Sequence, residues 1–282
     1  MRVTRLGMAL AVALFGSVAG GCSEDAGPFL APVVPLAYTR FVSAVPDTTA
    51  MVWRFIDGVA NSPFALGQAF RGFTPYQATT PGARHLRIFP TSTSIAITSQ
   101  IVIDTTLTFE ASKYYTIVHV GLSRAGGAPA DRIVVFEDMP PSVTGATIQF
   151  RVVNLGPGLN TGAPGAVDAF ATAATADALP ATALYANVAF LAASSYTTRA
   201  TGNLAVRATA AGTTTPVLAN VAAPPGLAAD PALSGSGTGG ALQAGSVLSA
   251  FIFPRSTAGS GAPQTTAFTS PIIIYLTDRR PL

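Results

Sequence analysis

The sequence predicts an all-β protein with two tandem β-sandwich domains, immunoglobulin- or transthyretin-like, after a signal peptide and a short tether. Three observations support this prediction. Short runs rich in Val, Ile, Thr, Phe and Tyr alternate with Gly, Pro and Asn, as strands alternate with turns. Helical periodicity is scarce, and the chain contains an internal repeat. With 49% hydrophobic and only 10% charged residues, the composition excludes a highly charged disordered protein.

The first residues have the pattern of an export signal. Arg2 and Arg5 precede an uncharged, mostly apolar run over Leu6–Val18, and small residues follow at 19–21. The run is too short to cross a bilayer, which takes about 20 residues. We therefore expect residues 1–21 to be a signal peptide. Its removal takes two arginines from a formal net charge of +3, so the basic balance gives no argument for an anionic partner.

The only cysteine of the chain, Cys22, follows this run directly. Small residues before a cysteine at this place resemble the lipobox of bacterial lipoproteins. That resemblance implies a lipidated thiol, and several acyl chains would attach the protein to a membrane. Ala19 stands where Leu is commonest, so an ordinary secretory signal is the alternative. Ser23 after the cysteine, in place of Asp, favours the outer membrane or cell surface.

The chain after Cys22 divides into a tether, residues 22–36, and two units, residues 37–141 and 142–282. The strands expected are Tyr38–Val45, Ala50–Asp57, Arg84–Phe89, Gln100–Phe109, Tyr114–Leu122, Arg132–Asp138, Thr147–Leu155, Ala166–Phe170, Leu204–Thr209, Ser246–Phe253 and Pro271–Thr277. Turns of helix are expected only at Phe64–Phe70 and Val167–Leu179. An Ala, Gly, Pro and Ser stretch, residues 222–245, is typical of a flexible insertion.

The internal repeat relates the two units in collinear order. Phe70, Tyr76, Gly82 and Arg87 recur at the same spacing as Phe190, Tyr196, Gly202 and Arg207. The further pairs are Arg40 with Arg151, Tyr114–Thr116 with Val247–Ser249, and Ile133–Phe136 with Ile272–Tyr275. This order favours duplication of a whole domain.

The opening of the first unit, Arg40–Asp47 followed by Val52–Gly58, resembles the bacterial "domain of unknown function 4397" family. The second unit matches through Arg151–Asn154 and Val167–Phe170. The resemblance implies a β-sandwich on exported bacterial proteins and no established activity. The family histidine is replaced by Ser43 and Asn154. The family aspartate aligns with Trp53 in the first unit and is kept as Asp168 in the second.

The sequence shows no residue pattern typical of a catalytic site. His119 aligns with Ile252 and His85 with Ala205, which favours packing positions over catalysis. Zinc needs three or four ligands, and the sequence indicates neither a metal site nor a cofactor. Residues 235–240 fit a dinucleotide motif without the strand and helix that it requires. Asp47 and Asp57 are expected to bind backbone in turns. The aromatics of the first unit, Trp53, Phe55, Phe70, Phe73 and Tyr76, are expected mainly in the core.

We therefore expect a lipid-anchored, exported cell-envelope protein that is not an enzyme and acts as a structural, adhesive or binding module. Its partner would be an envelope protein or glycan and not a nucleic acid; the oligomeric state stays open. The alternative is a secreted enzyme or small-ligand carrier with a site between the two domains. A pocket that joins Asp168, His85 and His119 would favour that alternative.

Overall fold

The computed structural model describes residues 35–156, 165–228 and 237–281. The predicted signal peptide 1–21, Cys22 and nearly all of the tether 22–36 lie outside these residues. Every element below belongs to one unit, Leu36–Leu282. In the part of the chain that is described, no helix has the length and apolar character to cross a bilayer.

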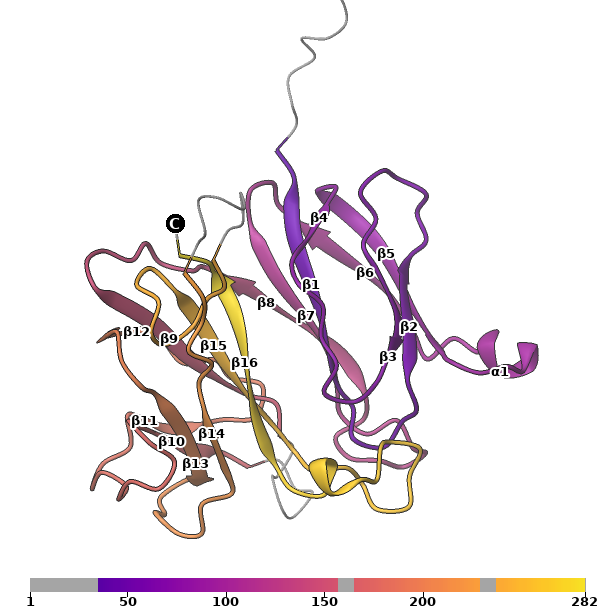
Figure 1. Ribbon diagram of the computed structural model, residues 1–282. Helices are drawn as coiled ribbons and strands as arrows, with labels where there is room; N and C mark the ends of the chain where they lie inside the picture. Colours follow the sequence, from indigo (N-terminus) through magenta and orange to yellow (C-terminus); the bar gives the residue numbers. More distant parts are fainter. Residues whose placement is uncertain (1–34, 157–164, 229–236, 282) are drawn as a thin grey trace, which may run out of the picture. The chain divides into compact units, whose positions relative to one another are not determined.

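Eight strands form a first sandwich of two four-stranded sheets (Figure 1). Its inner sheet has the order β4-β1-β7-β8 and its outer sheet the order β3-β2-β5-β6. β1 and β7 run parallel, and the other neighbours run antiparallel. The strands are β1 Ala37–Ala44, β2 Met51–Phe55, β3 Phe64–Gln68, β4 Gln77–Thr79, β5 Gly82–Pro90, β6 Ile103–Phe109, β7 Tyr114–Val120 and β8 Arg132–Asp138.

The next eight strands form a second sandwich with the same connectivity. Its inner sheet has the order β12-β9-β15-β16 and its outer sheet β11-β10-β13-β14. Each strand takes the place of the strand eight earlier, and the parallel pair β9–β15 repeats β1–β7. The strands are β9 Thr147–Asn154, β10 Val167–Thr172, β11 Tyr185–Val188, β12 Thr197–Ala200, β13 Ala205–Ala210, β14 Ala219–Ala222, β15 Val247–Phe253 and β16 Ile272–Arg279. The all-β prediction is confirmed.

The sequence prediction was wrong about helix. Phe64–Phe70 contains the edge strand β3, in which Ala65 is buried between exposed Phe64 and Leu66. Val167–Leu179 begins as β10 and continues as turns. Strands β4, β11, β12 and β14 were missed because each is only three or four residues long. The helical turns that do form are α1, Ile95–Thr98, and η3, Thr266–Phe268.

The predicted insertion 222–245 begins on the last residue of β14. Its residues 229–236 lie outside the described part. Leu227 and Thr238 form an isolated β-bridge, and Ala241 is buried in the core of the second sandwich. A Cβ atom on Gly240 would come within 2.1 Å of the Gly226 nitrogen. The described ends of this stretch are therefore packed against each other.

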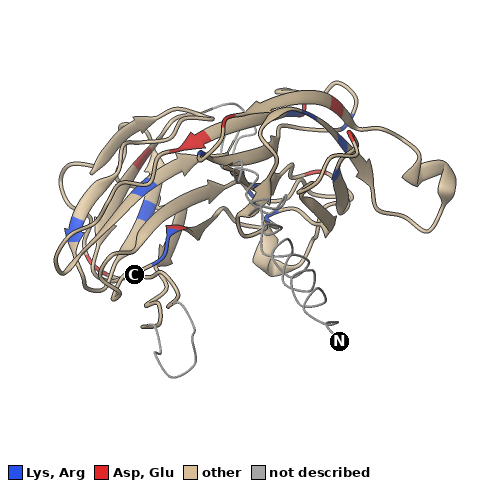
Figure 2. Cartoon of the chain, turned by 90° about the horizontal axis from the view of Figure 1, so that it is seen from above, with Lys and Arg blue, Asp and Glu red and all other residues tan. Residues whose placement is uncertain are grey.

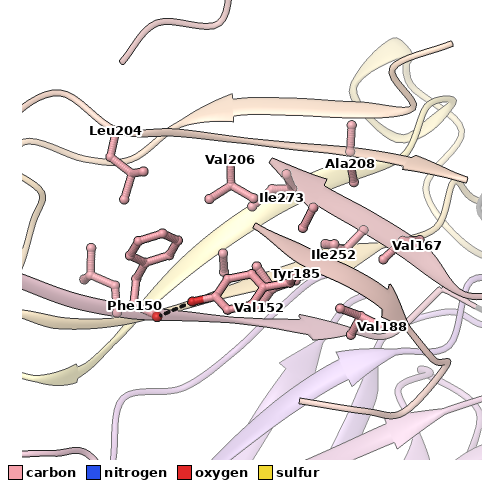
Figure 3. Close-up of a cluster of buried hydrophobic side chains, with 14 of the residues drawn as sticks. Phe150, Val152, Val167, Tyr185, Val188, Leu204, Val206, Ala208, Ile252 and Ile273 are labelled. Atoms are coloured by element: carbon pink, nitrogen blue, oxygen red, sulfur yellow. Dashed lines mark hydrogen bonds between the residues drawn. The ribbon is translucent and has the colours of Figure 1, made fainter. Parts of the chain in front are cut away.

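Each sandwich has its own hydrophobic core between its two sheets. The first core is centred on Trp53, Phe41 and Phe109. The second contains Phe150 and Tyr185, whose hydroxyl donates to the Phe150 carbonyl at 2.9 Å (Figure 3). Burial of such large side chains is the main stabilising term in a sandwich.

A third core joins the two inner sheets. It takes Val42, Val118 and Val120 from the first sandwich and Phe251 and Phe253 from the second. The two inner sheets are thus covered on both faces, which explains why all of β15 is buried. The continuous apolar runs in β8 and β16 have the same origin.

Arg71 crosses the same junction beside this third core. Its guanidinium donates to the carbonyls of Pro254, Ala267 and Ser270 at 2.5–2.6 Å. Burial lowers the pKa of Arg71 to about 10, so it is still charged at neutral pH. Backbone carbonyls take the place of a carboxylate partner and hold the segment before β16 to the first sandwich.

Candidate functional site

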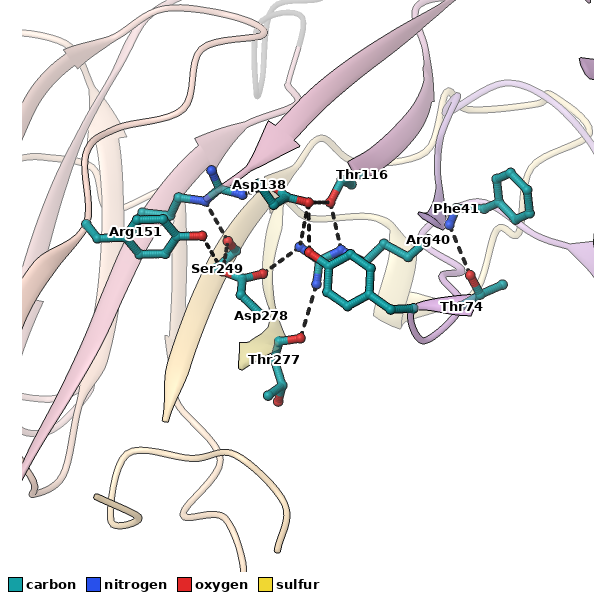
Figure 4. Close-up of polar contacts among 11 residues, drawn as sticks. Arg40, Phe41, Thr74, Thr116, Asp138, Arg151, Ser249, Thr277 and Asp278 are labelled. Atoms are coloured by element: carbon teal, nitrogen blue, oxygen red, sulfur yellow. Dashed lines mark hydrogen bonds and ion pairs between the residues drawn. The ribbon is translucent and has the colours of Figure 1, made fainter. Parts of the chain in front are cut away.

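Two buried arginines, one from each sandwich, form reciprocal ion pairs with aspartates of the other sandwich. Arg40 on β1 donates from Nη2 to Oδ1 of Asp278 on β16, at 2.6 Å (Figure 4). Arg151 on β9 forms the reciprocal ion pair with Asp138 on β8. Each arginine of one sandwich is therefore neutralised by an aspartate of the other.

The same hydroxyl groups surround each aspartate. Thr116 and Tyr76 donate to Oδ2 of Asp138 at 2.5 and 2.7 Å. Ser249 and Tyr196 donate to Oδ2 of Asp278 at 2.5 and 2.8 Å. We call this set the arginine–aspartate cluster: Arg40, Tyr76, Thr116, Asp138, Arg151, Tyr196, Ser249 and Asp278.

The arginines are also held by neighbours of their own sandwich. The Nε atoms of Arg40 and Arg151 donate to Thr116 and Ser249, both at 2.7 Å. Each guanidinium lies over a tyrosine ring, at 4.5 Å from the centroid of Tyr76 and 4.8 Å from that of Tyr196. Cation–π contacts of this kind strengthen when they are desolvated.

Electrostatics fix the protonation of this cluster. Burial alone would lower the pKa of Arg40, but Asp278, Tyr76 and Asp138 outweigh it and raise that pKa above its usual value. Burial raises the pKa of Tyr76 and Tyr196 well above that of a free tyrosine. Arg40 and the two tyrosines therefore keep their protons near neutral pH, and we interpret the cluster as structural.

Sequence reasoning found three of the four pairs in this cluster. The repeat paired Arg40 with Arg151, Tyr76 with Tyr196 and Thr116 with Ser249, as the structure does. It aligned Ile133–Phe136 with Ile272–Tyr275, whereas the strand pairing places Phe136 with Leu276, one residue further along. Only this register brings Asp138 and Asp278 to equivalent positions. A β-bulge at Val247–Leu248 shifts the pairing next to them.

The three residues of the predicted alternative site have separate partners. His119 on β7 is fully buried, 3.2 Å from Oδ2 of Asp131, with its ring edge-on to Trp53. His85 is exposed on β5 and bonds Asp104. No described contact joins these histidines to each other or to Asp168. Among the described residues, no three His, Cys, Asp or Glu side chains form a metal-binding group.

Asp168 on β10 holds backbone. Its Oδ1 accepts the Asn187 amide at 2.7 Å, and its Oδ2 accepts the Gly212 amide at 2.8 Å. Asp168 pairs with Thr209, and the repeat relates Thr209 to Phe89. Because Phe89 pairs with Val52, the equivalent of Asp168 is Val52. The predicted alignment of Asp168 with Trp53 was wrong by one residue.

The predicted turn aspartates do bind backbone or anchor a strand. Asp47 accepts the amides of Ser123 and Arg124 at 3.0 and 3.1 Å. Asp57 forms a bidentate pair with Arg84 at 2.7 and 2.9 Å and accepts the His85 amide. The hydrogen bond from Arg84 lowers the pKa of Asp57.

The predicted core aromatics divide into three groups. Trp53, Phe55 and Phe70 are buried, Phe70 in the third core. Tyr76 serves the arginine–aspartate cluster. Phe73 is 47% exposed, so the core prediction fails for it.

Charged residues are sparse along the chain (Figure 2). On the outer sheet of the first sandwich, strand pairing brings three of them together, Arg54, Arg87 and Asp104. Strand pairing places Phe64, Arg54, Arg87 and Asp104 side by side across the four strands. Arg87 donates to Asp104 at 2.9 Å, and His85 bonds the same carboxylate. These hydrogen bonds, that of His85 foremost, lower the pKa of Asp104.

Arg54, unlike Arg87, has no hydrogen-bonding partner in this row. It is exposed, and no hydrogen bond or ion pair to it is found in the described part of the chain. A hollow of about 310 Å³ opens beside it, lined by Val52, Arg54, Phe89, Pro90, Thr91, Ser92 and Thr98. We call this side of the sheet, with its hollow, the outer face of the first sandwich.

A second, larger hollow lies on the second sandwich. It measures about 450 Å³ and is lined by Phe150, Ala171, Pro180, Thr182, Ala183, Leu184, Thr197, Thr198 and Arg199. The guanidinium of Arg199 already donates to the Asn203 carbonyl, at 3.4 Å.

Comparison with known proteins places the first sandwich in a family. Residues 37–163 match the model described as "Domain of unknown function (DUF4397)". These residues form a DUF4397 domain. The match covers β1 to β8 and continues through β9. No curated protein matches the chain.

One solved structure with a weak likeness is a leucine-rich repeat protein from Bacteroides thetaiotaomicron VPI-5482. Its sequence identity is 11% and its TM-score 0.17, over 67% of this chain and 24% of that chain. The chain thus spans about a quarter of that protein's length, and so low a TM-score does not indicate a shared fold.

The DUF4397 opening sequence can now be placed in the structure. Its arginine is Arg40, the buried partner of Asp278. Its histidine position holds Ser43, which is buried and lies beside His119 in the parallel β1–β7 pairing. In this DUF4397 domain the arginine of the opening motif therefore links the inner sheet of the first sandwich to that of the second.

We expect Asp278→Ala to lower the free energy of unfolding by about 3–5 kcal/mol, because it leaves the Arg40 charge buried without its partner. Asp104→Ala on the surface should cost much less, because solvent screens exposed ion pairs. Urea unfolding followed by circular dichroism measures both. Equal losses for the two variants would contradict a structural role for the cluster.

Alkaline pH should destabilise the protein. Tyrosines of the unfolded chain ionise near pH 10, while Tyr76 and Tyr196 keep their protons in the fold because their pKa values are raised. The folded state then binds more protons than the unfolded state, so stability is full below pH 10 and falls above it. The Tyr76→Phe, Tyr196→Phe double variant should show a shallower fall between pH 10 and 11. An unchanged slope would be inconsistent with this explanation.

Proposed function

We propose that the protein is a lipid-anchored, exported component of the bacterial cell envelope that binds a partner without catalysis. The basic start, the apolar run and the small residues before Cys22 support the anchor. Ser23 supports the outer membrane or cell surface. The all-β fold from Leu36 onward would then stand in water at the end of a short tether.

The observation that carries the binding role is the outer face of the first sandwich. The polar groups described above are engaged in the fold: the arginine–aspartate cluster is paired, Asp168 and Asp47 bind backbone amides, and Asp57 binds Arg84. On the outer face, Arg54 has no described partner, and Phe64 and Leu66 are 58% and 62% exposed beside it. Exposed apolar side chains next to an unpaired arginine are typical of recognition surfaces.

The second sandwich lacks such an open face. The position of Arg54 is taken there by Phe170, which is 2% exposed. Residues between β10 and β11 fold back over this sheet, since Arg207 and Asn220 donate to the carbonyls of Asp177 and Thr175. The duplication therefore leaves one covered sheet and one open sheet, and the open one is our candidate surface.

The alternative, an enzyme or carrier with a site between the sandwiches, has less support. The side chains described as polar links between the sandwiches are those of the arginine–aspartate cluster and Arg71. The charged groups among them are buried, and each is already bonded to another side chain or to a backbone carbonyl. We therefore favour a binding module.

Metabolic labelling with radioactive palmitate in the producing cell tests the anchor. The wild-type chain should be labelled and should sediment with membranes. The Cys22→Ala variant should lose the label and appear in the soluble fraction, because its thiol acceptor is gone. Ser23→Ala is the matched control and should keep the label. Equal labelling of wild type and Cys22→Ala would refute the lipid anchor.

A further inference from the structure

The second sandwich seats a carboxylate of its own on its outer sheet. Asp168 lies where β10 pairs with β13, and its Oδ2 accepts the Gly212 amide in the turn after β13. The side chain is 8% exposed. The carboxylate of Asp168 thus lies between β10, β13 and the turn that follows β13.

The first sandwich has the same arrangement of two strands and a turn, but it has no carboxylate at the position of Asp168. Val52 replaces Asp168 in the same register. The turns correspond as well, because Thr91 donates its amide to Ala50 at 2.9 Å and Ala211 donates to Ala166 at 3.1 Å. The equivalent of Gly212 is then Ser92. No described group accepts the Ser92 amide, and the 310 Å³ hollow lies at this place.

Charge on the outer face complements an acid. Arg54 lies directly opposite Arg87 on the neighbouring strand, and like charges in that position are unfavourable. Asp104 neutralises Arg87, which leaves Arg54 with the uncompensated charge. A carboxylate in the hollow would pair with Arg54 and could accept the Ser92 amide, as Asp168 accepts that of Gly212.

We propose that this hollow binds the carboxylate of an acidic sugar, a uronic acid residue of an exported polysaccharide. Val52, Phe89 and Pro90 offer apolar surface for the C–H face of a sugar ring. Thr91, Ser92 and Thr98 supply hydroxyls at the rim. The volume falls within the range of about 300–1,000 Å³ typical of small-molecule sites. The inference rests on the proposed binding function and names its ligand.

Calorimetric titration of the full chain carrying Cys22→Ala with an oligogalacturonate tests the site. The acid should bind, and its methyl ester should bind at least about 10-fold more weakly. Arg54→Gln should lower the affinity about 10- to 100-fold, as expected for loss of a hydrogen bond to a charged group. Arg199→Gln is the matched control and should bind as the parent does, because this half-buried arginine lies on β12 of the second sandwich.

Val52→Asp is a second, independent variant. It introduces into the first sandwich a carboxylate equivalent to that of Asp168. This carboxylate should occupy the hollow and so abolish binding. Trp53 fluorescence and circular dichroism verify that each variant is folded. If Val52→Asp does not fold, the result for Arg54→Gln still decides the proposal.

Three outcomes would overturn the inference: no binding of the oligogalacturonate, equal binding of its ester, or unchanged affinity in Arg54→Gln. Oligoglutamate binding as tightly as the sugar, with the same dependence on Arg54, would replace the sugar by an acidic peptide. Sedimentation with purified envelopes separates this test from that of the proposed function. If parent and Arg54→Gln sediment equally, the inference fails and the binding function stands; if the parent does not sediment, the binding function fails.

Discussion

The exchange of ion pairs between Arg40 and Asp278 and between Arg151 and Asp138 is the constraint on which the rest of the structure depends. Within its own sandwich, Arg40 approaches Asp138 only to 3.9 Å, whereas Asp278 of the other sandwich lies at 2.6 Å. A buried guanidinium without a close partner is strongly unfavourable. The closest carboxylate partner of the buried Arg40 therefore comes from the other sandwich.

This dependence shapes the sheets around the cluster. The two inner sheets must meet face to face, so they bury Val42, Val118, Phe251 and Phe253 on the sides turned away from their own cores. Arg71 adds a second link through three carbonyls. Both inner sheets are thus taken up by the junction, and the outer sheets lie away from it. The second of these is covered by its own chain.

The sequence predicted the parts of the fold that packing dictates. Strands β1, β7, β9 and β15 were found because burial on both faces makes them rich in β-branched and aromatic residues. Strands β8 and β16 are less buried and were found by their continuous apolar runs. The edge strands β4 and β12 were missed because Gln77–Thr79 and Thr197–Ala200 are short and polar. No apolar pattern distinguishes such strands from loops.

The sites were harder to predict because they depend on register. A slip of one residue turns a strand's side chains to the opposite face. A slip of this size separated Asp138 from Asp278 and matched Asp168 with Trp53 instead of Val52. Arg54 carries no signal in the sequence, since its importance lies in what its counterpart Phe170 and the neighbouring Asp168 do in the other sandwich. Cys22 was singled out by its position after the apolar run; it lies outside the described residues, and its lipidation stays a prediction.

The interdependence of the two sandwiches can be measured through Trp53, the single tryptophan of the chain, which lies in the first core. Phe150→Ala removes a side chain from the second core only and should cost about 3–5 kcal/mol. If the exchanged ion pairs make the sandwiches unfold together, the urea midpoint of Trp53 fluorescence will fall by as much as that of circular dichroism. A fluorescence midpoint that stays at the wild-type value would contradict the account.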